Sequence, residues 1–263
     1  MIRSVRDFSR AVYVQPKDSR KGENGRLLVI GGSKDYHGAP LFSLLAARRF
    51  VDLLYFLPAE KDPYLIAAVK RIPEVIVVDS VRSPAIRGKL DCVLFGIGLS
   101  DAKFDLSKLK TLNAKLVIDG DGLKRVKGKV PKGAILTPHE GEFRMLFGIE
   151  GNEKNVRAMA SKTGCIILKK GPTDIVSDGR EVFLNNTHNQ GMTRGGTGDV
   201  LAGLVAALAC KMDPFTAACA GAMVNGQAGE MLSLEHGYNY SAGDLAEMLS
   251  RAHRELMNPK YAD

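Results

Sequence analysis

The chain has 263 residues, of which 45% are hydrophobic and 25% are charged. This length suits one large α/β domain or two small ones, and the sequence contains no linker, repeat or low-complexity tract, so we expect a single domain over residues 1–263. The formal net charge of +8 suits a small polyanionic ligand such as a nucleotide. Because the basic residues are dispersed and lack interleaved aromatic side chains, we expect no nucleic-acid partner.

The sequence predicts neither a secretory leader nor a membrane span. The first residues hold no apolar region of signal-peptide length, and the longest strongly apolar run, residues 200–210, is shorter than the about 20 residues that cross a bilayer. The cysteines show no Cys-x-x-Cys spacing and most lie in apolar runs, which predicts reduced thiols in the core. We therefore expect a cytoplasmic protein.

Short apolar, β-branched runs alternate with helix-like segments along the first two thirds of the chain. This rhythm predicts a mostly parallel sheet with helices on both faces. The predicted strands are residues 27–30, 53–57, 75–78, 92–95, 116–118, 134–136 and 165–168.

The pattern changes after Gly171. Two short runs within residues 174–184 are joined by Asp178-Gly179, which is typical of a hairpin and predicts an antiparallel edge on the sheet. The last third is helical, with an N-cap and first-position proline at Asp213-Pro214 and a capping-box pattern over residues 241–244.

Most predicted strands end in small or polar residues. Ligands of open α/β sheets bind at the carboxyl ends of the strands, so these endings should share one rim. The first ending, Gly31-Gly32-Ser33, is followed by residues 37–40 and an apolar helix, and could receive a ligand or be an ordinary turn with His37 at the surface. The turn at residues 96–100 resembles a truncated dinucleotide fingerprint, with Ser100 where a third glycine would fall, which argues against a simple dehydrogenase.

Two further endings carry titratable side chains. Residues 137–142, Thr-Pro-His-Glu-Gly-Glu, follow a strand and suggest a site; the alternative is a helix start with Thr137 as cap and Pro138 in the first position. Residues 169–174, Lys-Lys-Gly-Pro-Thr-Asp, could bring a lysine to a diphosphate, but without P-loop spacing. The sequence shows no metal-ligand spacing and no Gly-x-Ser-x-Gly nucleophile elbow.

The most informative segment is the glycine-rich run of residues 191–199, which leads directly into the apolar residues 200–209. Unpaired amides at the start of such a helix favour an anion, so the segment predicts a phosphate site. Asp199 at that position suggests a separate task, such as holding a hydroxyl or a metal beside the phosphate. The alternative is that Asp199 is only the helix cap.

Taken in order, these motifs resemble those of the ADP/ATP-dependent NAD(P)H-hydrate dehydratases, a family of the ribokinase-like superfamily. The resemblance covers residues 25 to 250 approximately. It implies a three-layer sandwich with a mostly parallel central sheet, helices on both faces and an antiparallel edge hairpin. The matching segments are residues 28–33 with 38–40, 96–99, 117–123, 136–142, 170–174 and 195–203.

The resemblance implies a repair enzyme. NADH or NADPH that has taken up water on its nicotinamide ring would be phosphorylated at the new hydroxyl by ADP or ATP with Mg²⁺, and would then lose phosphate. Phosphate leaves far more easily than hydroxide, which explains why a phosphoanhydride is consumed. We expect Asp199 to accept or orient the hydroxyl proton while the glycine loop holds the phosphoryl group. Because an aspartate with an ordinary pKa is a weak base, we expect positioning to matter more than proton abstraction.

The family pattern also assigns ligand contacts. The predicted substrate contacts are Ala39, Gly96, Gly98, His139 and Asp199. The predicted nucleotide contacts are Lys170, Gly171, Pro172, Thr173, Asp174, Gly196, Thr197 and Gly198. No residue is assigned to a metal, and the choice between Lys169 and Lys170 stays open. The family turn is usually Gly-Pro-Gly-Leu-Gly, whereas Ile97 and Ser100 replace the proline and the final glycine here.

The resemblance further implies partners. Many relatives carry a preceding epimerase domain, so we expect a separate NAD(P)H-hydrate epimerase to act with this chain, and we expect ADP rather than ATP as donor. A homo-oligomer such as a tetramer is expected from the family. The alternatives are a kinase of hydroxyethylthiazole or hydroxymethylpyrimidine, which usually has cysteine in place of Asp199, and a nucleotide-binding regulatory module without turnover.

Overall fold

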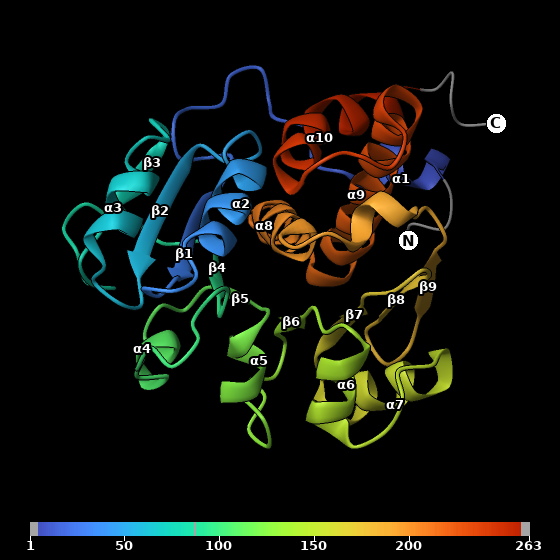
Figure 1. Ribbon diagram of the computed structural model, residues 1–263, viewed down its shortest axis with the longest axis horizontal. Helices are drawn as coiled ribbons and strands as arrows, with labels where there is room; N and C mark the ends of the chain where they lie inside the picture. Colours follow the sequence, from blue (N-terminus) through green and yellow to red (C-terminus); the bar gives the residue numbers. More distant parts are fainter. Residues whose placement is uncertain (1–4, 87, 259–263) are drawn as a thin grey trace.

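A single twisted sheet runs through the molecule and separates two layers of helices (Figure 1). The computed structural model describes residues 5–86 and 88–258, and nine strands in this part of the chain follow the order β3-β2-β1-β4-β5-β6-β7-β8-β9. The strands are β1 Arg26–Gly31, β2 Leu53–Pro58, β3 Val75–Val77, β4 Cys92–Phe95, β5 Lys115–Ile118, β6 Ile135–Leu136, β7 Ile166–Lys169, β8 Asp174–Ser177 and β9 Val182–Asn185.

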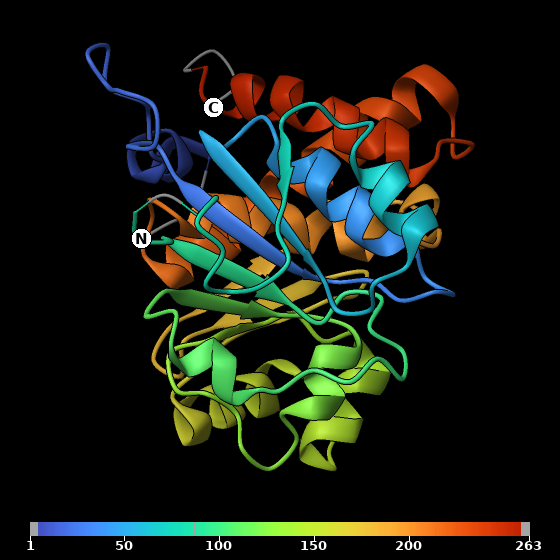
Figure 2. The same cartoon turned by 90° about the vertical axis from the view of Figure 1, so that its left-hand side faces the viewer.

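Strands β1 to β7 pair in parallel, so their carboxyl ends lie at the same edge of the sheet. Figure 2 shows β1, β2 and β4 side by side with their arrowheads toward that edge. Strands β8 and β9 are antiparallel and complete the other end of the sheet. The predicted sheet and edge hairpin are therefore confirmed, with small differences in strand bounds.

Helices α2, α8, α9 and α10 cover one face of the sheet, and α4 to α7 cover the other (Figure 1). The helices are α1 Val5–Ala11, α2 Gly38–Ala47, α3 Pro63–Val69, α4 Ser107–Lys110, α5 Asp121–Arg125, α6 Glu140–Phe147, α7 Glu153–Thr163, α8 Thr197–Ala209, α9 Pro214–His236 and α10 Ala242–Leu256, with a 3-10 turn, η1, at Gln190–Thr193.

Alternation within the strands builds both layers of the core. In β1, Leu27 and Val29 pack with α2 and α8, whereas Leu28 and Ile30 pack into the core on the opposite face. Successive strand side chains point to opposite faces, so a strand that is apolar at every position must be covered on both. All four cysteines are buried and unpaired, as predicted; they are Cys92, Cys165, Cys210 and Cys219.

Helix α8 lies at the centre of its layer and carries the glycine-rich motif at its start. Every residue of α8 except Gly198 and Asp199 is buried. Gly203 permits close packing against α2, because a Cβ there would lie 2.3 Å from the carbonyl oxygen of Ser43. At the other end, Lys115 Nζ donates to the carbonyl oxygens of Ala209 and Met212, both at 2.8 Å. These contacts hold the start of α8 in a fixed position above the sheet.

The two C-terminal helices begin as predicted. Asp213 caps α9 with Pro214 in its first turn, and Ser241 and Asp244 form the capping box of α10. No helix among the described residues is long and apolar enough to span a bilayer.

Candidate active site

The carboxyl ends of three strands and the start of α8 form one site. Asp119 follows β5, Thr137 follows β6 and Lys170 follows β7. A parallel bridge between His139 and Lys170 extends the pairing of β6 and β7 beyond the strands. The structure therefore brings together motifs that are separated by up to 80 residues of sequence, counting from 119 to 199.

The residue that caps α8 is not Asp199. The N-cap is Gly196, with φ of 96°, so the alternative in which Asp199 caps the helix is wrong. Glycine suits this position because the backbone adopts the left-handed region and a Cβ would lie 2.5 Å from the Phe42 ring. Asp199 occupies the first turn, and its own carbonyl oxygen accepts a hydrogen bond from Ser43 Oγ at 2.8 Å.

The carboxyl group of Asp199 has an unusual environment. Burial and the nearby carboxylates of Asp119 and Glu142 raise its pKa, Lys170 partly opposes them, and the net result is a pKa of about 7. A carboxyl group that titrates near neutral pH can accept a proton from a reacting hydroxyl much better than an ordinary aspartate can.

Lys170 provides the positive charge of the site. Its Nζ lies 2.7 Å from Asp119 Oδ1, and the same oxygen accepts a hydrogen bond from Thr137 Oγ1 at 2.7 Å. Burial lowers the pKa of Lys170, but Asp119 and Glu142 outweigh it, so the net pKa is raised and the lysine carries its charge. A Cβ on Gly198 would lie 3.3 Å from this Nζ, which places the ammonium beside the first amides of α8.

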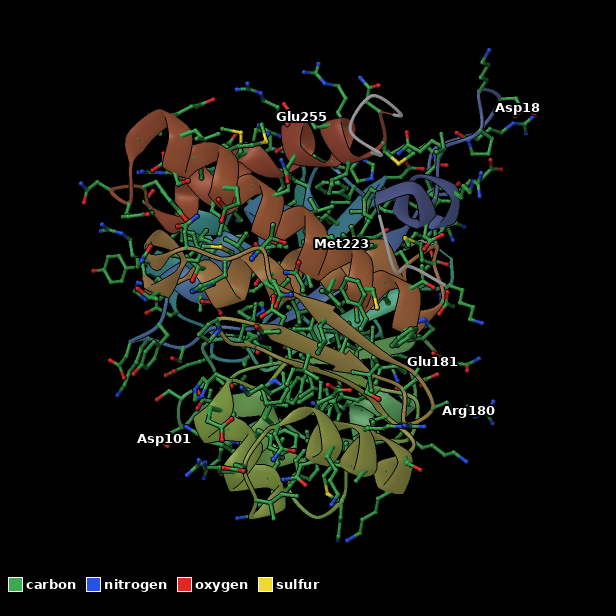
Figure 3. The ribbon with its side chains drawn as sticks, turned by 90° about the vertical axis from the view of Figure 1, so that its right-hand side faces the viewer. Asp18, Asp101, Arg180, Glu181, Met223 and Glu255 are labelled. Atoms are coloured by element: carbon green, nitrogen blue, oxygen red, sulfur yellow. The ribbon has the colours of Figure 1, made fainter. Side chains whose placement is uncertain are left out.

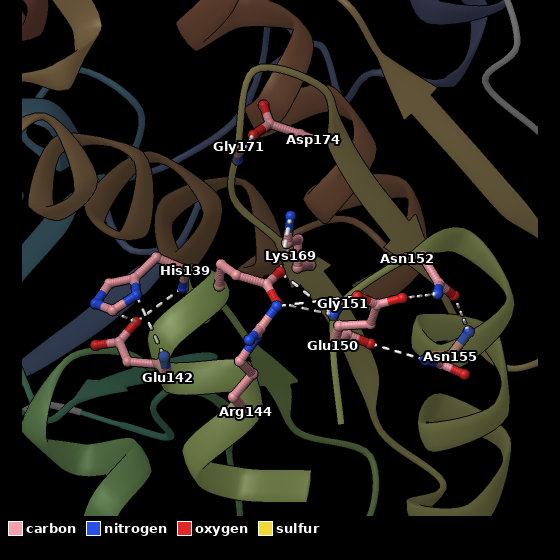
Figure 4. Close-up of polar contacts among 11 residues, drawn as sticks. His139, Glu142, Arg144, Glu150, Gly151, Asn152, Asn155, Lys169, Gly171 and Asp174 are labelled. Atoms are coloured by element: carbon pink, nitrogen blue, oxygen red, sulfur yellow. Dashed lines mark hydrogen bonds and ion pairs between the residues drawn. The ribbon is translucent and has the colours of Figure 1, made fainter. Parts of the chain in front are cut away.

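Lys169 points elsewhere. Its Nζ lies 3.3 Å from Glu140 Oε2, and Glu140 also accepts from Arg144 Nε at 2.7 Å and from the backbone of Gly151 (Figure 4). Of the two adjacent lysines, Lys170 is thus the one in the site, whereas Lys169 joins β7 to α6.

A cleft of about 370 Å³ opens beside Lys170 and the start of α8. It is lined by seven of the predicted residues, namely His139, Lys170, Gly171, Pro172, Asp174, Thr197 and Gly198. Thr173 and Gly196 flank the cleft without lining it. The side chain of Asp174 shapes the loop, since it accepts from Gly171 N at 3.1 Å and from Asn185 Nδ2 at 3.2 Å.

The cleft also contains residues that the sequence analysis missed, among them His188 and Asn225. Asn225 in α9 is 4% exposed, and its buried Oδ1 has no hydrogen-bond partner among the described residues. A buried acceptor without a partner is costly, so this atom is suited to a ligand. The available signal was an amide side chain directly after a run of small and apolar residues, 217–224.

His139 begins α6 and lies at the rim of the cleft. Its Nδ1 accepts from Glu142 N at 3.2 Å, and Glu142 Oε2 accepts from His139 N at 2.9 Å, which together form a capping box (Figure 4). The alternative with Thr137 as cap and Pro138 in the first position is therefore wrong, because Thr137 is engaged with Asp119. Since Nδ1 is an acceptor, a neutral His139 carries its proton on Nε2.

The two glycines of the predicted substrate loop, Gly96 and Gly98, have different surroundings. Gly98 lies against Ala39, where a Cβ on Gly98 would be 3.1 Å from the Ala39 Cβ. Gly96 instead permits close backbone packing, since a Cβ there would lie 2.3 Å from the carbonyl oxygen of Asp119. The two departures from the family turn are accommodated: Ile97 is buried in the core, and Ser100, with φ of 48°, donates its N–H to Asp121 Oδ2 at 2.8 Å.

A family model described as NAD(P)H-hydrate dehydratase matches residues 27–251 of this chain. The chain belongs to the NAD(P)H-hydrate dehydratase family. This membership confirms the predicted family and the predicted enzyme class, and it decides against the alternative of a vitamin-precursor kinase.

Individual members of the family resemble the chain over most of its length. The ADP-dependent (S)-NAD(P)H-hydrate dehydratase of Cenarchaeum symbiosum is 39% identical, with 92% of this chain and 93% of that protein covered. The bifunctional NAD(P)H-hydrate repair enzyme of Pyrobaculum aerophilum is also 39% identical, but the match covers 54% of its length.

Comparison with solved structures confirms the ribokinase-like α/β fold. The ADP/ATP-dependent NAD(P)H-hydrate dehydratase from Bacillus subtilis, co-crystallized with ATP/Mg²⁺, superimposes with a TM-score of 0.83 at 23% identity. The alignment covers 96% of this chain and 97% of that one.

Proposed function

We propose that this protein is an ADP-dependent (S)-NAD(P)H-hydrate dehydratase that converts hydrated NADH and NADPH back to the reduced cofactors. The observation that carries the proposal is the position of Asp199, a half-buried aspartate at the start of α8 and beside Lys170, whose pKa is raised to about 7. The ADP-dependent relative from Cenarchaeum symbiosum, similar over nearly the whole chain, supports ADP as donor.

We place the nucleotide in the cleft beside Lys170. The amides of Thr197 and Gly198 and the Lys170 ammonium would hold the diphosphate, since helix N-termini and lysine favour phosphate charge. The loop of residues 171–174 would enclose the nucleotide on its other side. Asn225 would accept a hydrogen bond from the exocyclic amine of adenine, which gives its unpartnered oxygen a role.

Magnesium would reach the site with the nucleotide. The described residues include no group of three or more His, Cys, Asp or Glu side chains that could hold a metal ion by themselves. Mg²⁺ is commonly held by substrate phosphates together with one or two carboxylates. The carboxylates of Asp119 and Asp199, which both interact with Lys170, would be available to the ion. The ion would neutralise the developing charge of the transferring phosphoryl group.

The proposed reaction has two stages. The ring hydroxyl attacks the terminal phosphorus of ADP, its proton passes to Asp199, and the bridging phosphoanhydride bond breaks to release AMP. The lone pair of the ring nitrogen then expels the phosphate from C6, and loss of a proton from C5 restores the ring double bond. Asp199 thus acts as base and positioning group for the first stage.

The substrate would lie on the other side of Asp199 from the nucleotide. Ala39 and Gly98 would permit close approach of the hydrated nicotinamide, Gly96 would allow the tight turn that leads to Gly98, and His139, at the rim of the nucleotide cleft, would donate from Nε2. A separate epimerase would supply the S form of the substrate. We also propose a homo-oligomeric assembly, as expected from the family.

The decisive experiment mixes the purified protein with hydrated NADH, Mg²⁺ and either ADP or ATP. We expect recovery of dihydronicotinamide absorbance and formation of AMP with ADP, and slower recovery with ATP. Reactions without nucleotide and without protein are the controls. Absence of recovery with both nucleotides would refute the dehydratase, and faster recovery with ATP would reverse the proposed donor.

A further inference from the structure

A second cavity lies on the same rim, on the opposite side of the substrate loop from the nucleotide cleft. It has a volume of about 330 Å³ and is lined by residues that follow β1, β2 and β4, including Ser33, Lys34, Asp35, Glu60, Asp101 and Lys103. Figure 3 labels Asp101 on this edge of the molecule, opposite Arg180 and Glu181 of the turn between β8 and β9.

Ser33 marks this cavity as a binding site. The residue is 1% exposed, and its buried Oγ has no hydrogen-bond partner among the described residues. A buried hydroxyl without a partner loses its hydration and gains nothing in return. A ligand group in the cavity would supply the missing partner.

The order of the strands connects this cavity to the reacting end of the substrate. Asp119 follows β5, and the strands β4, β1 and β2 come next in the sheet. With about 4.8 Å between neighbouring strands, the ends of β1 and β2 lie roughly 10 to 14 Å from the end of β5. Gly98 and Ala39 lie between the two positions. A dinucleotide whose nicotinamide is at Asp199, with ADP on the β7 side, must extend in this direction.

We propose that this cavity binds the adenosine half of the hydrated cofactor and favours hydrated NADH over hydrated NADPH. The inference rests on the proposed function. The cavity presents three carboxylates, of Asp35, Glu60 and Asp101, against the two ammonium groups of Lys34 and Lys103. Carboxylates accept hydrogen bonds from the ribose hydroxyls of NADH, whereas they repel the 2′-phosphate of NADPH.

The test compares steady-state kinetics of the full chain with hydrated NADH and hydrated NADPH at saturating ADP. We expect a KM several-fold lower for hydrated NADH at low salt, and a smaller difference at high salt because ions screen the repulsion. Equal KM values, or a preference for hydrated NADPH, would overturn the charge discrimination.

Substitutions of cavity residues test whether this cavity causes the difference in KM between the two substrates. Asp101→Asn combined with Glu60→Gln is expected to lower the KM for hydrated NADPH several-fold, and Asp105→Asn, on the same loop but outside the cavity, is the matched control. Ser33→Ala removes a hydroxyl that has no partner in the protein, so it should leave the melting temperature unchanged while raising the KM for both substrates by up to about tenfold, the effect of one hydrogen bond.

The outcomes separate the two proposals. Unchanged KM values in all of these variants, with normal turnover, would refute the adenosine site while leaving the dehydratase intact. Absence of turnover by the unmodified protein with either substrate would refute the proposed function itself.

Discussion

The ammonium of Lys170 and the carboxylate of Asp119 are 2.7 Å apart, and both side chains are largely buried. This pair sets the electrostatics of the site. Asp119 keeps the lysine charged and positioned beside the start of α8, and it also raises the pKa of Asp199. One carboxylate therefore prepares both the proposed phosphate contact and the proposed base.

Replacement of Asp199 by asparagine tests the proposed base. We expect Asp199→Asn to lower kcat by roughly 10²- to 10⁴-fold, as is typical when a general base is lost. The Kd for ADP should change little or improve slightly, because a carboxylate next to the phosphates is removed. Stopped assays for AMP and calorimetric titration with ADP measure the two quantities.

Asp213→Asn is the matched control, because it makes the same chemical change at the cap of α9, outside the cleft. It should retain full activity. A kcat for Asp199→Asn equal to that of the unmodified protein would show that Asp199 is only a helix-start residue.

The pKa of Asp199 predicts the pH dependence of turnover. The base must be ionised to accept a proton, so kcat/KM should rise with pH and level off above about 7. An ordinary aspartate would place this limb near its usual value of about 4. The measurement is a profile of kcat/KM for hydrated NADH between about pH 5 and 9, with correction for substrate stability. A profile that is flat between about pH 5.5 and 8 would contradict the assignment.

The raised pKa of Asp199 also lowers the free energy of unfolding at neutral and higher pH. Its pKa is raised from 3.8 to about 7 in the folded state, so ionisation favours the unfolded chain. The destabilisation begins above pH 3.8, grows until about pH 7 and is complete above it. At 1.36 kcal/mol per pKa unit it reaches on the order of 4 kcal/mol.

Asp199→Asn should accordingly melt several degrees above the unmodified protein at about pH 8, and this difference should shrink as the pH falls toward 4. Thermal melts of both proteins across this pH range provide the measurement. Identical melting temperatures at every pH would mean that the carboxyl group is not desolvated.

Asn225 predicts how the enzyme distinguishes nucleotide bases. Leucine has a similar volume, and it removes an amide whose oxygen has no partner, so Asn225→Leu should fold normally. We expect its KM for ADP to rise by about tenfold and its preference for ADP over IDP, which lacks the exocyclic amine, to diminish. Kinetics with the two nucleotides measure this preference. An unchanged ratio would place the base elsewhere in the cleft.

Local sequence patterns were sufficient to predict most of the strands, the edge hairpin and a buried helix over the apolar residues 200–209. The alternation of apolar residues and the positions of glycine and proline reflect interactions between residues that are close in sequence. These patterns therefore predict individual strands, turns and helices. The ordered motifs likewise led to the family, and they placed Asp199 at the start of a helix.

The residue that caps α6 could not be identified from the sequence. Thr137 and His139 both suit the start of α6, and the choice depends on Asp119, which takes the Thr137 hydroxyl from 18 residues away in sequence. The same holds for Lys169 and Lys170, because neighbouring strand residues point to opposite sides and only the packing of Glu140 shows which lysine enters the cleft.

The order of the elements, the family and the residue types that could perform the chemistry follow from the amino-acid sequence. The folded structure is needed to show which of these residues meet, that Asn225 and Ser33 are buried with oxygens that have no partner among the described residues, and that Asp199 has a pKa near neutral. The physical reason is that desolvation and charge interactions depend on distances between residues far apart in the chain, and only folding sets those distances.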